Sequence, residues 1–222
     1  MAKLRLAVTL VFVTCLAACG ASQVIVSPIL DLPTPLVDPI PVDIGIYYSQ
    51  SFRNFVYDES KDSQGVDDTS IHLGNAQISM FDRVFAAYFS TVQVLERGEP
   101  ASKRAGLDAV LVPQVVDVEY SVPRTSKAKI YEVWIKYQFD LLAPDGTTIA
   151  KWTMPVYGKT PTALLKSNDE AINLASMMAL RDSGAAFITG FSKVPEVAQW
   201  LDRSISSASG PNQSDHGEVN NE

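Results

Sequence analysis

The clearest pattern in the chain is an alternation of apolar and polar residues across positions 131–141, with Trp134 as the one exception. One face of this stretch is apolar and consists of Tyr131, Val133, Ile135, Tyr137, Phe139 and Leu141. A period of two is typical of a β-strand with one buried and one wet face. Asp145 and Gly146 follow and predict a tight turn, and residues 149–156 then alternate again. The pattern therefore predicts an antiparallel hairpin.

Shorter apolar runs predict further strands at residues 42–48, 55–57 and 107–122. Pro113 lies inside the last of these. A proline cannot donate a ladder hydrogen bond, so we expect it at a bulge or at a sheet edge.

Apolar residues recur every three or four positions in the segment that follows Asn75, which is a suitable helix cap. They are Ile78, Phe81, Val84, Phe85, Tyr88, Phe89, Val92 and Leu95. This spacing predicts one long helix with a thick aromatic stripe. We interpret the stripe as core, and the alternative is that it lines a groove for a hydrophobic ligand.

Ser167 and Glu170 have the spacing of a capping box and predict a helix over residues 171–179. A weaker continuation through residues 187–188 and an amphipathic turn over 197–205 follow. Together these elements predict an α+β fold, with a largely antiparallel sheet and a long helix and C-terminal helices packed on one face. We expect one domain over residues 42–205 and a disordered acidic tail over 206–222.

The N-terminal segment has the pattern of a signal peptide. Lys3 and Arg5 precede an apolar run over residues 6–16, which is too short to span a bilayer, since a spanning helix needs about twenty residues. Small residues then lead to Cys19. We therefore predict that residues 1–18 are a signal peptide.

The residues Leu16, Ala17, Ala18 and Cys19, followed by Gly20, resemble the lipobox of bacterial lipoprotein precursors. The resemblance implies that diacylglycerol is attached to the Cys19 thiol, that the chain is cut before it, and that the new amino group receives a third acyl chain. Several chains give lasting retention, whereas one binds only marginally. Gly20, rather than aspartate, implies the periplasmic face of the outer membrane. The alternative is an ordinary secretory signal, cut near Ala18 or Ser22.

Residues 19–41 contain five prolines and few charges. Such a density favours extended chain, so we predict a lipidated cysteine followed by a proline-rich tether. The stretch also contains apolar residues, and the alternative is that part of it lies along the domain.

The net charge of the chain limits the kinds of partner that we expect it to bind. The net charge is -7, and cleavage would remove the two positive charges of Lys3 and Arg5. An acidic chain is a poor candidate for binding nucleic acid or for electrostatic adhesion to anionic lipid. We therefore expect no nucleic acid partner, and the lipid on Cys19 would hold the protein at the membrane.

The sequence shows no catalytic signature. His72 is the one histidine of the predicted body, His216 lies in the tail, and one histidine with a lipidated cysteine cannot build a metal site. GxSxG, GxGxxG and Walker motifs are absent. The acidic pairs at 58–59 and 67–68 lack the spacing of a calcium loop and are interpreted as solvated turns. We predict no catalytic residues, no metal and no cofactor beyond the covalent lipid.

Trp134 interrupts the polar face of the predicted strand at 131–141, and Trp152 lies on its predicted partner. If both indoles point to the wet face, they form an aromatic patch of the kind that anchors protein interfaces. The alternative is that a helix covers them and that they belong to the core.

The element order and the phrases at 105–115 and 141–149 are similar to those of periplasmic accessory lipoproteins. These include auxiliary subunits of lipid-trafficking ABC transporters and the α+β domains of the curli-export and TolB amino-terminal class. The resemblance implies a non-enzymatic accessory or scaffold in cell-envelope assembly or transport, with an envelope protein as partner. A periplasmic carrier or sensor of a hydrophobic ligand is the alternative, and a hydrolase is a third hypothesis.

Overall fold

The computed structural model of the chain describes residues 22–25, 34–58, 69–97, 105–121, 130–161 and 167–208. A five-stranded sheet has the order β5-β2-β6-β7-β8, and a three-stranded sheet has the order β1-β4-β3. The strands are β1 (Ser22–Ile25), β2 (Ile40–Tyr47), β3 (Val56–Asp58), β4 (Thr69–His72), β5 (Phe89–Leu95), β6 (Ala109–Ser121), β7 (Ile130–Leu142) and β8 (Thr148–Pro161). The helices are α2 (Gln50–Arg53), α3 (Gly74–Tyr88), α4 (Asn168–Gly190), the 3-10 helix η5 (Phe191–Lys193) and α5 (Pro195–Ala208).

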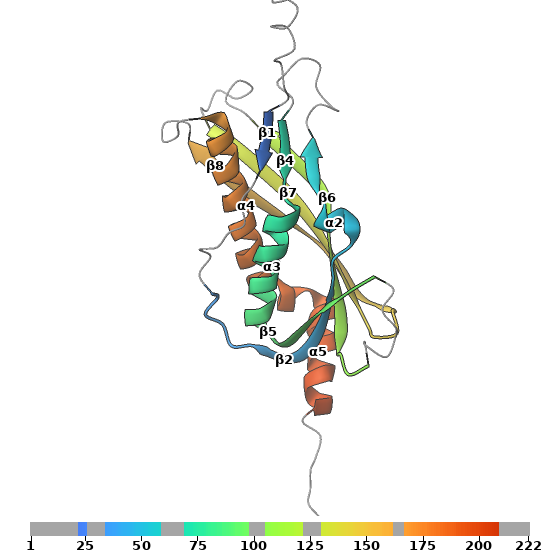
Figure 1. Cartoon of the computed structure of the whole chain (residues 1–222). Coiled ribbons are helices and arrows are strands. Elements are labelled where there is room, and N and C mark those ends of the chain that lie inside the picture. The colour runs from blue at the N-terminus through green and yellow to red at the C-terminus, as the bar shows by residue number, and fades with distance from the viewer. Residues whose placement is uncertain are drawn as a thin grey trace, which may run out of the picture.

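The large sheet is mixed. Strand β2 pairs in parallel with both β5 and β6, whereas β6, β7 and β8 form a long antiparallel meander. Figure 1 shows α3 and α4 lying side by side across one face of this sheet. The predicted α+β class is confirmed, and the parallel pairs on β2 are an addition to the predicted antiparallel core.

The predicted hairpin is present as β7 and β8. The two strands pair from Ile130 opposite Pro161 to Leu142 opposite Thr148. Gly146 has a φ of 93°, in the region that favours glycine, and Asp145 Oδ1 accepts hydrogen bonds from the Thr147 amide at 2.9 Å and its hydroxyl at 2.7 Å. Turn chemistry and alternation therefore agree, which is why the sequence was sufficient here.

Strand β6 has a partly open edge, as Pro113 led us to expect. Strand β2 pairs with β6 only at Ala109–Leu111, and none of the described strands pairs with the later part of β6 on that side. Pro113 lies just beyond this junction, so its missing N–H costs no ladder bond there. The bulge lies between Val115 and Asp117 rather than at the proline.

The helix predicted to continue to Leu95 is wrong at its C-terminal end. Helix α3 ends at Tyr88, and residues 89–95 form β5, which pairs in parallel with β2. The segment contains Thr91, Val92 and Val94, whose branched side chains favour a strand over a helix. The helix also begins earlier than predicted, with Leu73 rather than Asn75 at the N-cap.

Helix α4 confirms the predicted cap and exceeds the predicted length. The Ser167 hydroxyl accepts a hydrogen bond from the Glu170 amide at 3.2 Å, and the helix continues without a break to Gly190. It approaches β8 very closely at Gly158, where an added Cβ would lie 2.0 Å from the Ala175 carbonyl oxygen. Only glycine permits this contact between helix and strand.

The α4 side chain of Asp182 also protects the outer strand of the sheet. Strand β8 is the last strand in the sheet order, so amides on its outer side have no neighbouring strand. Asp182 Oδ2 accepts a hydrogen bond from the Tyr157 backbone N–H at 3.1 Å. A helix that covers the face of the sheet thus also satisfies a backbone donor at its edge.

The core lies between the sheet and the helices and is rich in aromatic rings. Phe85 and Phe187 meet at a centroid distance of 4.9 Å, and Phe81 meets Tyr137 edge to face at 5.2 Å. Phe81, Phe85 and Tyr88 are all buried. The aromatic rings of the stripe therefore belong to the core, which confirms our interpretation of these rings.

Part of the predicted tether lies along the body. Strand β1 occupies residues 22–25 and pairs in parallel with β4, and β2 begins at Ile40. The predicted signal peptide at 1–18, Cys19 and tail residues 209–222 lie outside the described residues. Residues 206–208 belong to α5. Of the described helices, none is both long and apolar enough to cross a membrane.

Candidate functional site

Trp134 lies on the sheet face opposite the helices and is 47% exposed. In the ladder it stands between Glu119 of β6 and Tyr157 of β8, so the three side chains form one row across the strands. The Trp134 and Tyr157 rings have centroids 4.2 Å apart with an interplanar angle of 36°. Cross-strand aromatic pairs of this kind stabilise a sheet and also present a rigid apolar surface.

The Tyr157 hydroxyl is fixed by a carboxylate. It donates a hydrogen bond to Glu132 Oε1 at 2.5 Å. Desolvation, followed by this hydrogen bond and the charge of Glu132, raises the pKa of Tyr157 to about 12. The phenol is therefore neutral near pH 7 and acts as a positioned hydrogen-bond donor and aromatic surface, not as a base.

A shallow hollow adjoins the indole. It has a volume of about 140 Å³ and is lined by Asp117, Glu119, Trp134, Ile135, Lys136 and Pro155. Acidic and basic side chains thus surround a partly exposed ring. We call Trp134, Tyr157 and Pro155 the aromatic patch. An aromatic centre with a charged rim is a composition that also occurs at protein interfaces.

Trp152, the second predicted contact residue, lies on the other face of the sheet. Its ring stacks on Phe139 at 5.2 Å and lies 5.8 Å from Phe191. Trp152 pairs with Phe139, whereas Trp134 pairs with Tyr157. Positions 152 and 157 are an odd number of residues apart on one strand, so their side chains take opposite faces. The structure does not bring the two tryptophans together, and the partner of Trp134 is Tyr157, which the sequence analysis missed.

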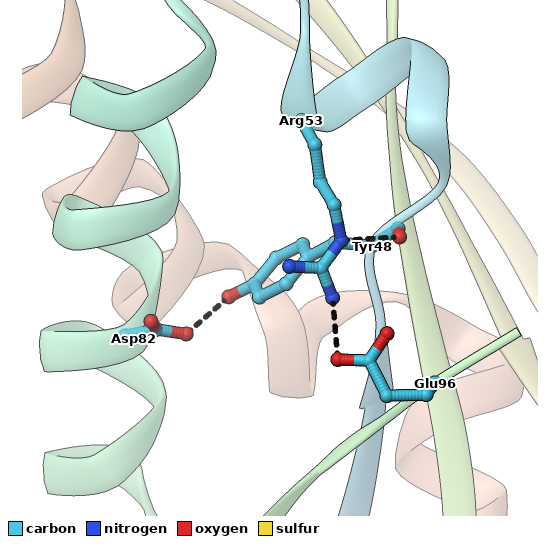
Figure 2. Close-up of polar contacts among 4 residues, drawn as sticks. All are labelled: Tyr48, Arg53, Asp82 and Glu96. Carbon is cyan, nitrogen blue, oxygen red and sulfur yellow. Dashed lines mark hydrogen bonds and ion pairs between the residues drawn. The ribbon is translucent and has the colours of Figure 1, made fainter.

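A polar network connects four elements at one side of the sheet. Figure 2 shows the Tyr48 hydroxyl donating to Asp82 Oδ1 at 2.7 Å, while Arg53 Nε donates to the Tyr48 carbonyl at 3.1 Å. Arg53 Nη2 also lies 3.4 Å from Glu96 Oε1. Burial, and then the charge of Asp82, raise the pKa of Tyr48 far above its usual value. Tyr48 is thus a permanently protonated donor, and the network holds α2, α3 and the end of β5 against β2.

A partly open groove of about 400 Å³ lies between α3 and α4. Most of its lining is apolar, and residues 34–36 of the N-terminal segment form part of that lining. Met80 and Val84 contribute from α3, and Ile188 contributes from α4. Two cationic side chains, Arg83 and Arg181, also line it, and no carboxylate does. The groove suits an apolar ligand with an anionic group.

The other residues considered in the sequence analysis, His72 and the two acidic pairs, do not form a site with neighbouring groups among the described residues. His72 is the last residue of β4, and its Nε2 atom is buried without a hydrogen-bond partner among the described residues. Asp58 ends β3, whereas the other members of the two acidic pairs lie outside the described residues. Within the described part of the chain, no three His, Cys, Asp or Glu side chains cluster closely enough to hold a metal ion.

Comparison with known proteins gives similarity in solved structures alone. No protein-family model matches the sequence, and no curated protein matches it. The chain is similar to protein XCC0632 of Xanthomonas campestris, with 13% identity, a TM-score of 0.48 and coverage of 83% of this chain and 99% of that one. A minor lipoprotein of Acinetobacter baumannii shares 9% identity at a TM-score of 0.43, covering 70% and 94%.

A third similar structure is lipoprotein B of Nitrosomonas europaea, with 12% identity, a TM-score of 0.35 and coverage of 81% of this chain and 94% of that one. All three TM-scores lie below 0.5. At this level of similarity none of these proteins defines the function of this chain.

Proposed function

We propose that this chain is a bacterial lipoprotein that acts as a non-enzymatic accessory or scaffold in cell-envelope assembly or transport. Lipid on Cys19 would anchor it to the periplasmic face of the outer membrane. The aromatic patch would receive an envelope protein. The single observation that carries the scaffold role is the exposed Trp134 ring, which packs against Tyr157 on the sheet face that the helices leave open.

The anchor is supported by the sequence. A charged start, an apolar run and the residues Leu16 to Cys19 occur in the order that lipoprotein precursors require. Two or three acyl chains on one residue give lasting attachment to a bilayer. The acidic body offers little electrostatic attraction to anionic lipid, so attachment would depend on Cys19.

The patch is supported by its energetics as well as its exposure. A half-exposed indole contributes little to folding, yet aromatic residues dominate binding energy when a partner covers them. The Glu132 hydrogen bond holds the Tyr157 ring in one orientation, which lowers the entropy lost when a partner binds. A pre-positioned aromatic pair is thus better explained by recognition than by stability.

Metabolic labelling with a clickable fatty acid tests the anchor. We expect label on the wild-type chain and none on Cys19→Ser, which should leave the membrane fraction. Cys15→Ser is the matched control, because Cys15 lies within the predicted signal peptide and its loss should leave both labelling and fractionation unchanged. An unlabelled wild-type chain in the soluble periplasm would refute the anchor.

Photo-crosslinking in living cells tests the patch. A photoreactive amino acid at position 134 should give a defined adduct with an envelope protein, and Tyr157→Ala should weaken it. The same amino acid at Thr153, an exposed position of β8 on the same face of the sheet, serves as the control. Equal adduct patterns at both positions would show that the patch is no specific interface.

The interhelical groove favours a second function, that of a periplasmic carrier or sensor of a hydrophobic ligand. The observation is the apolar lining between α3 and α4 together with Arg83 and Arg181. A groove of this size falls within the range of small-molecule sites, roughly 300–1,000 Å³. The ligand class that fits is a single acyl chain with a carboxylate or phosphate.

Binding of a fluorescent fatty acid to the full chain carrying Cys19→Ser tests this function without detergent. Ala185→Trp should fill the groove and abolish binding, and Thr189→Trp, an exposed position of α4 outside the lining, should not. Arg181→Glu should weaken the binding of the anionic fatty acid more than the binding of its neutral alcohol analogue. No saturable binding to the Cys19→Ser chain would exclude the carrier function.

A further inference from the structure

Strand β1 begins three residues after Cys19, and it is paired in register with the body. Its first pair is Ser22 opposite Thr69, and its last is Ile25 opposite His72. Figure 1 shows β1 and β4 at the end of the molecule where α4 also begins, and the end of α5 at the opposite end. The attachment point of the proposed lipid is therefore tied to one end of the fold.

The short chain between Cys19 and β1 limits the distance between the proposed lipid and the folded body. Three residues span at most about 11 Å even when fully extended. A proline-rich stalk would hold the body several nanometres from the bilayer, but β1 is formed before the prolines of residues 28–41 begin. Whatever path those later residues take, they cannot increase the distance between Cys19 and β1.

We infer that the protein rests on the membrane by the end formed by the starts of β1, β4 and α4, with the end of α5 pointing away from the bilayer. The inference rests on the proposed lipidation of Cys19. Helix α4 alone has 23 residues and is about 34 Å long, at 1.5 Å per residue. The two ends of the body thus lie at clearly different heights above the lipid.

This orientation constrains the partner. Tyr157 lies four residues before the end of β8 at Pro161, and Trp134 lies four residues after the start of β7 at Ile130. Four strand residues cover about 13 Å, and these strand ends lie near β1 and the start of α4 (Figure 1). The surface that faces the patch therefore belongs to the membrane-proximal part of an envelope protein rather than to a freely diffusing one.

Energy transfer from single labels to a dye on lipid headgroups tests the orientation in liposomes that carry the full, lipidated chain. The sequence has only Cys15 and Cys19, so a new cysteine is uniquely reactive once the first is cleaved off and the second is acylated. We choose Lys159→Cys near the start of α4 and Ser207→Cys in the last turn of α5, both exposed. We expect several-fold more efficient transfer from position 159 than from position 207.

A matched variant isolates the role of the short connection. Inserting about twenty glycine and serine residues after Gly20 gives a flexible spacer of roughly 25 Å and should bring the two efficiencies close together. Equal transfer in the native chain, or stronger transfer from position 207, would overturn the orientation. Failure of the chain to float with liposomes would instead refute the lipid anchor, so the two failures are distinguishable.

Discussion

Strand β7 has one face covered by the helices and one face open to solvent. Val133 is 0% exposed and its neighbour Trp134 is 47% exposed, although the two are adjacent in the chain. On the covered face the rings of Phe139, Phe187 and Phe191 exclude water and fix the helices. On the open face the paired rings of Trp134 and Tyr157 remain in contact with solvent. Aromatic content alone therefore does not distinguish the covered face from the open one, whereas the parity of the position does.

The sharpest test of this comparison is a pair of aromatic truncations, one on each face. Phe139→Ala should lower the free energy of unfolding by about 3–5 kcal/mol, because it leaves a cavity beneath α4. Trp134→Ala should lower it by less than about 1 kcal/mol, since its ring is half in water already. Urea denaturation followed by circular dichroism measures both. Equal losses would contradict the division between the faces.

The contact between α4 and β8 offers the next largest effect. Gly158→Ala places a methyl group against the Ala175 carbonyl, so the helix must move away from the strand. We expect a loss of about 2 kcal/mol, within the range for overpacked sites. Thr153→Ala on the exposed side of the same strand is the control and should change stability by no more than about 0.5 kcal/mol. Thermal or urea unfolding measures the stability of the two variants, and equal losses would contradict the close contact at Gly158.

The polar network in Figure 2 should contribute less than the apolar core. Tyr48→Phe removes the hydroxyl that donates to Asp82 and should cost about 1 kcal/mol, the usual net value of one hydrogen bond. Tyr47→Phe is the matched control, because no hydrogen bond involves the Tyr47 hydroxyl among the described residues. A loss for Tyr48→Phe no greater than for its neighbour would show that the network adds nothing to stability.

The smallest expected effect concerns Tyr157 at high pH. Its pKa is about 12 in the folded protein and about 10 in an unfolded chain. The folded state thus holds the phenol proton more tightly, so this contribution is complete below pH 10 and is lost as the pH rises from 10 to 12. Rapid pH-jump absorbance spectra of wild type minus Tyr157→Phe should show this late titration. Glu132→Gln should move the pKa towards 10, and an unchanged pKa would contradict the role of the carboxylate.

Local signals explain what the sequence could predict. The β7–β8 hairpin and the Ser167 cap depend on residues a few positions apart, so alternation, turn chemistry and cap spacing were enough. The end of α3 was missed because the apolar spacing continues past Tyr88, while the parallel partner of β5 is some fifty residues away in the chain. Long-range pairing of this kind leaves no local trace.

The candidate site could be predicted only where a local pattern marks its residues. Trp134 was identified because it breaks an otherwise polar face. Trp152 was placed beside it only on the condition that both faced water, and Tyr157 was overlooked because its partner depends on the exact register across the turn. The groove between α3 and α4 brings together residues about one hundred positions apart, which no local pattern specifies.

The hydrogen bond from the Tyr157 amide to Asp182 has a consequence for crowded surfaces. Lipoproteins confined to two dimensions collide often, and an uncovered outer strand invites the strand of a second copy to add to it. A strand that approached β8 would find the Tyr157 amide already hydrogen-bonded to the Asp182 carboxylate. Addition of a second copy along this edge is thereby opposed by one negative charge, and under the proposed anchor on Cys19 this charge would oppose polymerisation through β8 on a crowded membrane.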